Sequence, residues 1–306
     1  MKIFLTIIFY SFYLLFPLIV FLSWQLYKNK KRPIEIIILL ILAIFLIWMR
    51  FVELNNLIVK DYKFTKNKGY NNEIKVAVFS DMHLGVYNND SIIKKIVQKI
   101  KKINPDVVII PGDFIYFIDK NKLVEQFSDL KNISVPVLAV LGNHDYGKPE
   151  KNISQDLNSV LESLGIIMID NQVKKINING DLIEFIGTED IWVGNPDYEV
   201  LRKDGSEDQV DFTFFITHNP DTLYEVKDLA IDDYKKIDLM IAGHTHAGQI
   251  RLPILYKHII PTKYNFDKGF YNISNLNLFI TPGIGTVGLP LRLFNFPELS
   301  ILNIRY

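Results

Sequence analysis

The chain has 306 residues, with 34 basic and 34 acidic side chains, so its formal net charge is zero. A chain without excess positive charge is not expected to bind nucleic acid or another polyanion. Cysteine is absent, which excludes disulfides, thiolate nucleophiles and cysteine-type zinc sites. Any metal must therefore be bound by His, Asp, Glu or Asn.

Two apolar runs at the N-terminus predict a transmembrane helical hairpin. No charge occurs between Lys2 and Lys28, a stretch longer than the roughly 20 residues that cross a bilayer. The second run, "IEIIILLILAIFLIWMRFV" (residues 34–52), is apolar on every face, which is not typical of the core helix of a soluble protein. No small-x-small cleavage site follows the first run, so we interpret it as a membrane span rather than as a signal peptide. Residues 1–59 are thus predicted to be a membrane anchor.

The basic residues flanking the hairpin indicate its orientation. The loop of residues 28–32, "KNKKR", holds four cations, and five more lie at the end of the second run and after it: Arg50, Lys60, Lys63, Lys66 and Lys68. A short loop dense in cations is costly to translocate. We therefore expect a two-pass protein of the cell membrane with the loop inside and the rest of the chain outside.

The remainder of the chain predicts one soluble α/β domain. Residues 60–73 are polar and are interpreted as a linker, and residues 74–306 alternate β-branched runs with helix-like stretches. Helices are expected near residues 90–102, 120–130, 154–164 and 221–228. Strands are expected at residues 74–80, 106–110, 135–141, 173–178, 182–187, 211–217, 238–242, 277–281 and 299–304. Strands that do not alternate with helices suggest a second sheet packed on the first, an αββα sandwich.

Metal-competent side chains recur where these strands end. Three apolar runs stop at a glycine followed by such a residue, as "PGD", "LGN" and "AGH", and two more end in "SDMH" and "ITH". Because strand ends converge on one crevice, seven nitrogen and oxygen ligands are expected to meet there. They are Asp81, His83, Asp113, Asn143, His218, His244 and His246. Any one such motif alone would be an ordinary turn, and His258, outside the pattern, is interpreted as a surface or core histidine.

The motifs "DMH", "PGD", "GNHD", "THNPD" and "GHTH", in this order, resemble the calcineurin-like metallophosphoesterases. The runs "AGHTHAGQI" and "TPGIGTVGLPLR" further resemble the bacterial, often membrane-anchored phosphodiesterase branch. The resemblance implies two divalent metal ions, with Asp113 shared between them. One ion would be bound by Asp81, His83, Asp113 and His246. The other would be bound by Asp113, Asn143, His218 and His244.

A pair of dications suits hydrolysis of a phosphoester, because the ions lower the pKa of water and a bridging hydroxide can then attack in line. Mixed His and carboxylate ligation fits manganese, iron or zinc. His144, next to Asn143, is the candidate general acid for the leaving alkoxide. Asp145 either orients His144 or caps the following turn. Arg292 is a candidate phosphate contact.

The chain departs from the protein phosphatases that share this fold. Their motif "GDxVDRG" is replaced by "GDFIYFID", with Tyr116 and Phe117 at the Asp and Arg positions. We therefore expect a phosphodiesterase, whose substrate is lipid-linked or another envelope phosphodiester. A UDP-diacylglucosamine-type pyrophosphatase of lipid A precursors is the alternative if the domain faces the cytoplasm. A metal-binding scaffold is the non-enzyme alternative, although no ligand is lost; a transport role would require intramembrane charge. No obligate protein partner is inferred.

Overall fold

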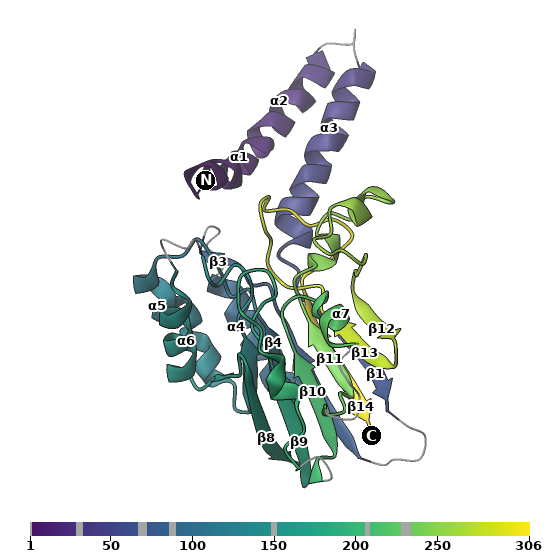
Figure 1. Cartoon of the computed structure of the whole chain (residues 1–306). Coiled ribbons are helices and arrows are strands. Elements are labelled where there is room, and N and C mark those ends of the chain that lie inside the picture. Colours follow the sequence, from purple (N-terminus) through teal and green to yellow (C-terminus); the bar gives the residue numbers. More distant parts are fainter. Residues whose placement is uncertain are drawn as a thin grey trace.

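The computed structural model describes residues 2–28, 33–66, 72–85, 90–147, 152–205, 209–227 and 234–306. A helical hairpin stands at one end of a two-sheet domain (Figure 1). The basic loop at residues 29–32, from which the orientation is inferred, lies outside the described residues, as does much of the expected linker.

The hairpin consists of two long apolar helical segments. The first comprises α1 (Lys2–Ser11), a 3-10 turn η1 (Phe12–Leu14) and α2 (Leu15–Lys28). The second comprises α3 (Pro33–Ile47) and the π-helical turn η2 (Trp48–Glu53). Ile3–Lys28 and Pro33–Glu53, with 26 and 21 residues, are each long and apolar enough to cross a membrane.

The first segment bends between α1 and α2. Pro17 has no N–H to donate to the carbonyl of residue 13, so the α-helical ladder is interrupted at η1. At about 1.5 Å per residue the whole segment would be about 39 Å long, which exceeds a hydrocarbon core of about 30 Å. The bend lets α1 pack on the catalytic domain instead, where Leu5 and Phe9 contact Tyr116 and Phe117.

Two six-stranded sheets form the catalytic domain. The first has the order β1 (Ile58–Thr65), β14 (Glu298–Arg305), β2 (Glu73–Val78), β4 (Val107–Pro111), β6 (Val137–Val140), β7 (Ile167–Met168). The second has the order β12 (Gly269–Ile273), β13 (Leu276–Ile280), β11 (Leu239–Ala242), β10 (Phe212–Ile216), β9 (Asp181–Gly187), β8 (Gln172–Ile178). A small parallel pair, β3 (Leu84–Gly85) and β5 (Ile115–Tyr116), lies beside the first sheet's loops.

The sheets pack face to face, and helices cover their outer faces, which confirms the predicted αββα sandwich. Side chains of both sheets, such as Val78 and Phe214, share one buried cluster between the layers. A second cluster joins the first sheet to α4 (Asp90–Ile103), α5 (Leu123–Phe127) and α6 (Ser154–Ser163). A third joins the second sheet to the short α7 (Thr222–Val226). The helix expected near residues 120–130 is divided into η3 (Lys120–Lys122), α5 and η4 (Ser128–Asn132).

The linker prediction needs correction at its N-terminal part. Residues 58–65 form β1, which pairs in parallel with β14 at the edge of the first sheet. Tyr62 and Phe64 pack against the inter-sheet core, whereas Lys60 and Lys63 face outward. Exposed lysines protect an edge strand from pairing with other chains, and here they give it the polar composition of a linker. Strand β12 was also not expected from the sequence.

Candidate metal centre

The seven predicted ligands are brought together at one rim of the sandwich. They follow β2, β4 and β6 of the first sheet and β10 and β11 of the second, and within each sheet these strands are parallel. Their carboxyl ends therefore open at the same end of the domain, toward the hairpin (Figure 1). Six of the seven are buried, and the Asn143 side chain is half-buried.

The backbone is strained at this rim. Five of the candidate ligands have left-handed φ angles between 48° and 71°, a region that non-glycine residues rarely adopt. They are Asp81, His83, Asp113, His244 and His246. Such conformations persist only where the surrounding structure imposes them, and they cluster at functional sites.

Glycines allow the ligand loops to approach one another. Gly112 has φ +80°, and a Cβ atom there would lie 2.6 Å from the backbone nitrogen of Gly142. A Cβ atom on Gly142 would in turn collide with the Asp113 carboxylate. The glycines of "PGD" and "LGN" are thus required because two ligand loops touch, not only because each loop turns.

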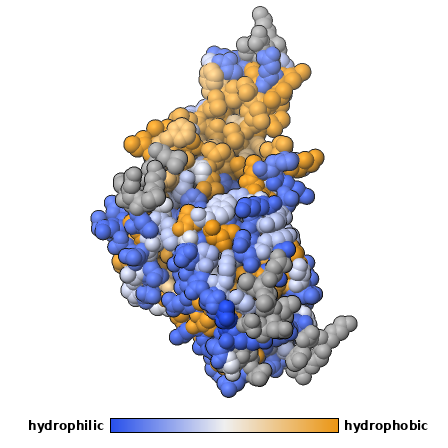
Figure 2. All heavy atoms as spheres, viewed as in Figure 1, coloured by the Kyte–Doolittle hydropathy of each residue, from blue (hydrophilic) through white to orange (hydrophobic). Residues whose placement is uncertain are grey.

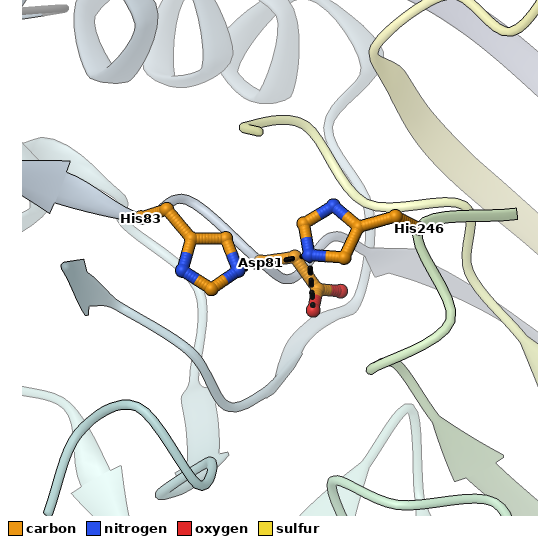
Figure 3. Close-up of side chains that lie close together, drawn as sticks. All are labelled: Asp81, His83 and His246. Carbon is orange, nitrogen blue, oxygen red and sulfur yellow. Dashed lines mark hydrogen bonds and ion pairs between the residues drawn. The ribbon is translucent and has the colours of Figure 1, made fainter. Parts of the chain in front are cut away.

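The first half of the centre contains Asp81, His83 and His246 (Figure 3). The two imidazoles stack, with ring centroids 4.8 Å apart, and their Nε2 atoms are 2.9 Å from each other. His246 Nε2 lies 3.5 Å from Asp81 Oδ1, and His83 Nε2 lies 3.4 Å from Asp113 Oδ2. These ligand atoms point toward one common position.

The second half contains Asp113, Asn143, His218 and His244. His218 Nε2 lies 3.2 Å from Asp113 Oδ2, 3.2 Å from Asn143 Oδ1 and 3.1 Å from His244 Nδ1. Asp113 Oδ2 is therefore close to a histidine of each half. Its carboxylate lies between the two groups, where a ligand shared by two ions would have to lie.

Carbonyl groups fix the tautomers in the second half. His218 Nδ1 donates to the carbonyl of Pro111 at 2.8 Å, and His244 Nε2 donates to the carbonyl of Pro261 at 3.0 Å. The lone pairs of His218 Nε2 and His244 Nδ1 then face each other. With both rings neutral this arrangement is repulsive, so either a proton on His218 or a metal ion must lie between them, and backbone carbonyls commonly orient metal-binding histidines in this way.

Donor spacing also fits metal ions. Two ligands at about 2.1 Å from one ion and at a right angle lie about 3 Å apart. The separations in both halves run from 2.9 to 3.5 Å. The residues present thus fit two divalent ions in spacing, in donor type and in the direction of their lone pairs.

The pKa values of the histidines also suit a metal centre. Burial lowers the pKa of His83 and of His244 to about 3, so both stay neutral, which is the form that binds metal. His218 is the exception: burial opposes its charge, but the adjacent Asp113 carboxylate raises its pKa to about 10. The buried carboxylates therefore attract positive charge to this position.

His144 lies at the edge of the centre. Its ring packs edge-on against His83 at 4.8 Å and against Tyr116 at 5.0 Å, and its backbone N–H donates to Asp113 Oδ1 at 2.9 Å. Burial lowers the pKa of His144. Tyr116, at the position where the protein phosphatases have an acidic residue, thus contacts His144 through its ring. His144 also belongs to a group with His83 and Asp113 that could hold a metal ion.

The Asp145 carboxylate is hydrogen-bonded to the backbone of two loops and not to the His144 side chain. This buried carboxylate accepts from the backbone N–H of Ile115 at 3.0 Å and of Gly142 at 2.8 Å. These contacts match neither of the two alternatives left open by the sequence, because Gly142 precedes Asp145 and Ile115 belongs to another loop. The loop after β4 and the loop after β6 are joined by this side chain.

The partners of Arg292 argue against its predicted role as a phosphate contact. It is fully buried, and its guanidinium donates to the carbonyls of Pro282, Gly285 and Asn295. Burial lowers its pKa to about 10, and the charge is partly compensated by Asp81. Arg292 therefore organises the loop that packs behind Asp81.

Sequence reasoning missed Trp192, which lines the pocket, and Asp190, which holds the Trp192 backbone. Trp192 lies edge-on to the His244 ring at 4.3 Å, and the buried Asp190 carboxylate accepts from the Trp192 N–H at 2.8 Å. The segment follows β9, which ends in Gly187, so the strand, glycine and acid pattern that identified the ligands occurs here once more. The side-chain amide of Gln249 donates to the carbonyl of Leu289 and accepts from the backbone N–H of Val287, so it fixes the loop that contains both residues.

The fold and the site together define an αββα hydrolase with a candidate dinuclear metal centre between its sheets. The chain belongs to the calcineurin-like phosphoesterase family, which matches residues 74–248. It is a metallophosphoesterase.

Curated relatives agree with this class. The chain is 28% identical over 237 residues to an uncharacterized metallophosphoesterase of Bacillus subtilis, YkuE, covering 76% of this chain and 79% of the relative. It is also 28% identical to the phosphodiesterase YaeI of Escherichia coli, covering 75% of this chain and 82% of the relative. A zebrafish transmembrane protein with a metallophosphoesterase domain is 27% identical, covering 75% of this chain and 52% of the relative.

Proposed function

We propose that this metallophosphoesterase hydrolyses a phosphodiester at a centre of two divalent ions. The single observation that supports this most is the spacing of the ligand atoms around Asp113, which lie 2.9 to 3.5 Å apart in both halves. In the proposal one ion is held by Asp81, His83 and His246, the other by Asn143, His218 and His244. Asp113 is shared.

When bound, the ions would lower the pKa of water to supply the nucleophile and would neutralise charge on the phosphate. The protein's own residues orient the reaction. Only two of the seven ligands are carboxylates, so the loaded centre stays positive and attracts an anionic ester. The pocket beside it has a volume of ≈ 370 Å³.

His144 is proposed to donate a proton to the leaving alcohol. It lies beside Asn143 at the pocket and packs against His83 and Tyr116, so its ring is held next to both halves of the centre. Those two ring contacts restrict its orientation without an acidic partner. Burial lowers the pKa of His144, so in this proposal the negative charge of the bound phosphate stabilises the imidazolium that supplies the proton.

A direct test is to purify the full chain in detergent, load it with manganese, iron or zinc, and measure both metal content and hydrolysis. The substrates to compare are a nitrophenyl phosphodiester, a nitrophenyl phosphomonoester and a UDP-linked glycolipid. Two ions per chain with fastest cleavage of the diester are expected. Faster cleavage of the UDP-linked glycolipid would favour the pyrophosphatase alternative, and one ion or none in active protein would refute the dinuclear centre.

We further propose that the hairpin spans the membrane and that the catalytic domain lies outside the cytoplasm. The relative from zebrafish is named as a transmembrane protein, and both helices have the required length. Because the chain has no cysteine, a single introduced cysteine reports location without background. Val124→Cys on exposed α5 should react with a membrane-impermeant maleimide in intact cells. Labelling only after lysis would place the domain in the cytoplasm.

A further inference from the structure

The pocket beside the metal centre is lined by two chemically different sets of side chains. One set is formed by Asp113, Asn143 and the histidines. The lining also includes apolar side chains, which we call the wall: Ile250, Ile259, Pro261, Val287 and Leu289. A phosphate group fits the first set only, so the wall must serve another part of the ligand.

This wall is in contact with the helical hairpin. Ile250 packs on a cluster that contains Met49 of η2 and Leu46 of α3. Val287 packs on the cluster that contains Leu5 of α1. The apolar surface of the hairpin therefore continues, through direct contacts, into the pocket.

The wall also reaches the exterior. Ile259 and Leu289 line the pocket and are 61% and 43% exposed. Beside them lie more exposed apolar side chains from the same two loops, and we call the whole set the ledge: Leu252, Ile254, Leu255, Ile259, Leu289 and Phe294. Apolar colour covers the hairpin and is also present at its lower end, beside the domain (Figure 2). Exposed apolar side chains gathered on two neighbouring loops are typical of an interaction site.

Backbone strain holds the ledge outward. Ile254 has φ +69°, which is an outlier for a β-branched residue, and its side chain is 78% exposed. The 3-10 turn η9 (Leu255–His258) starts directly after it. An isoleucine forced into this conformation and left in water is costly unless an apolar phase covers it.

Charge indicates what covers the ledge. Residues 250–266 and 282–297 contain no Asp or Glu, whereas Lys257 and Lys263 are exposed in the first loop. Apolar side chains with neighbouring lysines and no acidic residue suit the anionic headgroup region of a bilayer. The hairpin places the same surface at the level where its two helices meet the domain (Figure 1).

We infer that the ledge inserts into the membrane surface and that the pocket accepts an amphiphilic phosphoester directly from the bilayer. The phosphate lies at the metal centre, while the apolar tail lies along Ile250, Ile259 and Leu289 and stays continuous with the lipid. This inference rests on the proposed function for its chemistry. The contact between ledge and bilayer does not depend on catalysis.

The test uses two substrates with one leaving group, methyl nitrophenyl phosphate and hexadecyl nitrophenyl phosphate. The full chain is placed in nanodiscs of phosphatidylglycerol and phosphatidylcholine. Wild type should prefer the hexadecyl ester. The double variant Ile254→Asp, Leu255→Asp should lower that preference about 10-fold to 100-fold, because each aspartate removes an aliphatic contact with lipid. Cleavage of the methyl ester should not change, since neither residue lines the pocket.

Val124→Asp is the matched control, because Val124 is 57% exposed on α5, away from the ledge. An unchanged preference in the double variant, or an equal loss in the control, would overturn the inference. A change of oligomeric state with unchanged preference would assign the ledge to a protein contact instead. Failure of wild type to cleave either ester would count against the proposed function rather than against the ledge.

Insertion of the ledge into the membrane can also be measured without catalysis, by fluorescence. Ile254→Cys and Val124→Cys are each labelled with an environment-sensitive fluorophore in vesicles of phosphatidylglycerol. A blue shift and quenching by brominated lipid are expected at position 254 and not at position 124. Equal emission at the two positions would show that the ledge stays in water.

Discussion

The two halves of the metal centre hold their histidines by different means. In the second half, His218 and His244 each donate to a proline carbonyl, which fixes tautomer and ring direction. In the first half, the Nδ1 atoms of His83 and His246 are buried without a hydrogen-bond partner among the described residues. Their rings are instead stacked on each other, 18° apart.

The two halves thus differ in how the imidazole is oriented before a metal ion binds. A carbonyl partner raises the basicity of the imidazole and sets its lone pair before any metal binds. Stacking sets the ring plane but leaves the proton free to occupy either nitrogen. We therefore expect the second half to be the tighter metal site and the first half to depend more on the metal for its order.

The largest loss of metal and of activity is expected on substitution of Asp113, which lies between the two halves. Asp113→Asn removes the shared carboxylate, so both ions should be lost or weakened and phosphodiester hydrolysis should fall roughly 10⁴-fold. Asp81→Asn is the matched variant, since the Asp81 carboxylate lies near the ligand nitrogen of His246 in the first half and meets the second half through the backbone N–H of His244. It should release one ion and retain the other. Metal analysis of the two purified proteins distinguishes them, and equal metal contents would contradict a shared Asp113.

The next prediction concerns His144, whose ring contacts His83 of the first half but which is not proposed as a metal ligand. His144→Ala should keep both ions but lose roughly 10²–10⁴-fold in rate on alkyl esters, because the alkoxide leaves unprotonated. On nitrophenyl esters, whose phenolate leaves without a proton, most activity should return. The loss of an ion would mean that His144 is a ligand, and an equal loss on both ester types would exclude the acid role.

Chelation should separate the two halves directly. As EDTA increases, the first-half ion should leave before the second-half ion, with an affinity gap of about 10-fold to 100-fold from the carbonyl partners. Electron paramagnetic resonance of the manganese form distinguishes coupled pairs from single ions. The remaining ion should match in affinity the single ion of Asp81→Asn. Release of both ions in one step would remove the distinction between the halves.

The smallest effect on chemistry is expected at Asp145, which joins the loops that carry Asp113 and Asn143. Asp145→Asn turns one acceptor into a donor facing a backbone N–H, which should cost about 1–3 kcal/mol in the free energy of unfolding. Metal content should be retained. Asp61→Asn, at an exposed position on β1, is the control and should melt like wild type. A large activity loss with normal stability would mean that Asp145 acts on His144 after all.

Much of the fold was predictable because its signals are local. The alternation of buried runs with helical periods predicted both sheets and three of the outer helices, and the uncharged runs predicted the hairpin. β1 escaped prediction because an edge strand buries few residues, and the charges of Lys60, Asp61 and Lys63 conceal its pattern. Its partner, β14, lies more than 200 positions away in the chain.

At the site, residue type and spacing are enough to say which residues gather, because carboxyl ends of parallel strands must open at one rim and the polar residues there are few. How these residues are used depends on contacts between loops. The assignment of Nε2 in His218 but Nδ1 in His244 depends on the carbonyls of Pro111 and Pro261, which come from other loops. Likewise Arg292, a plausible phosphate ligand by residue type, is buried among carbonyls. Residue type and spacing are properties of a segment, whereas tautomer, burial and the ledge beside the hairpin arise from contacts between segments far apart in the chain.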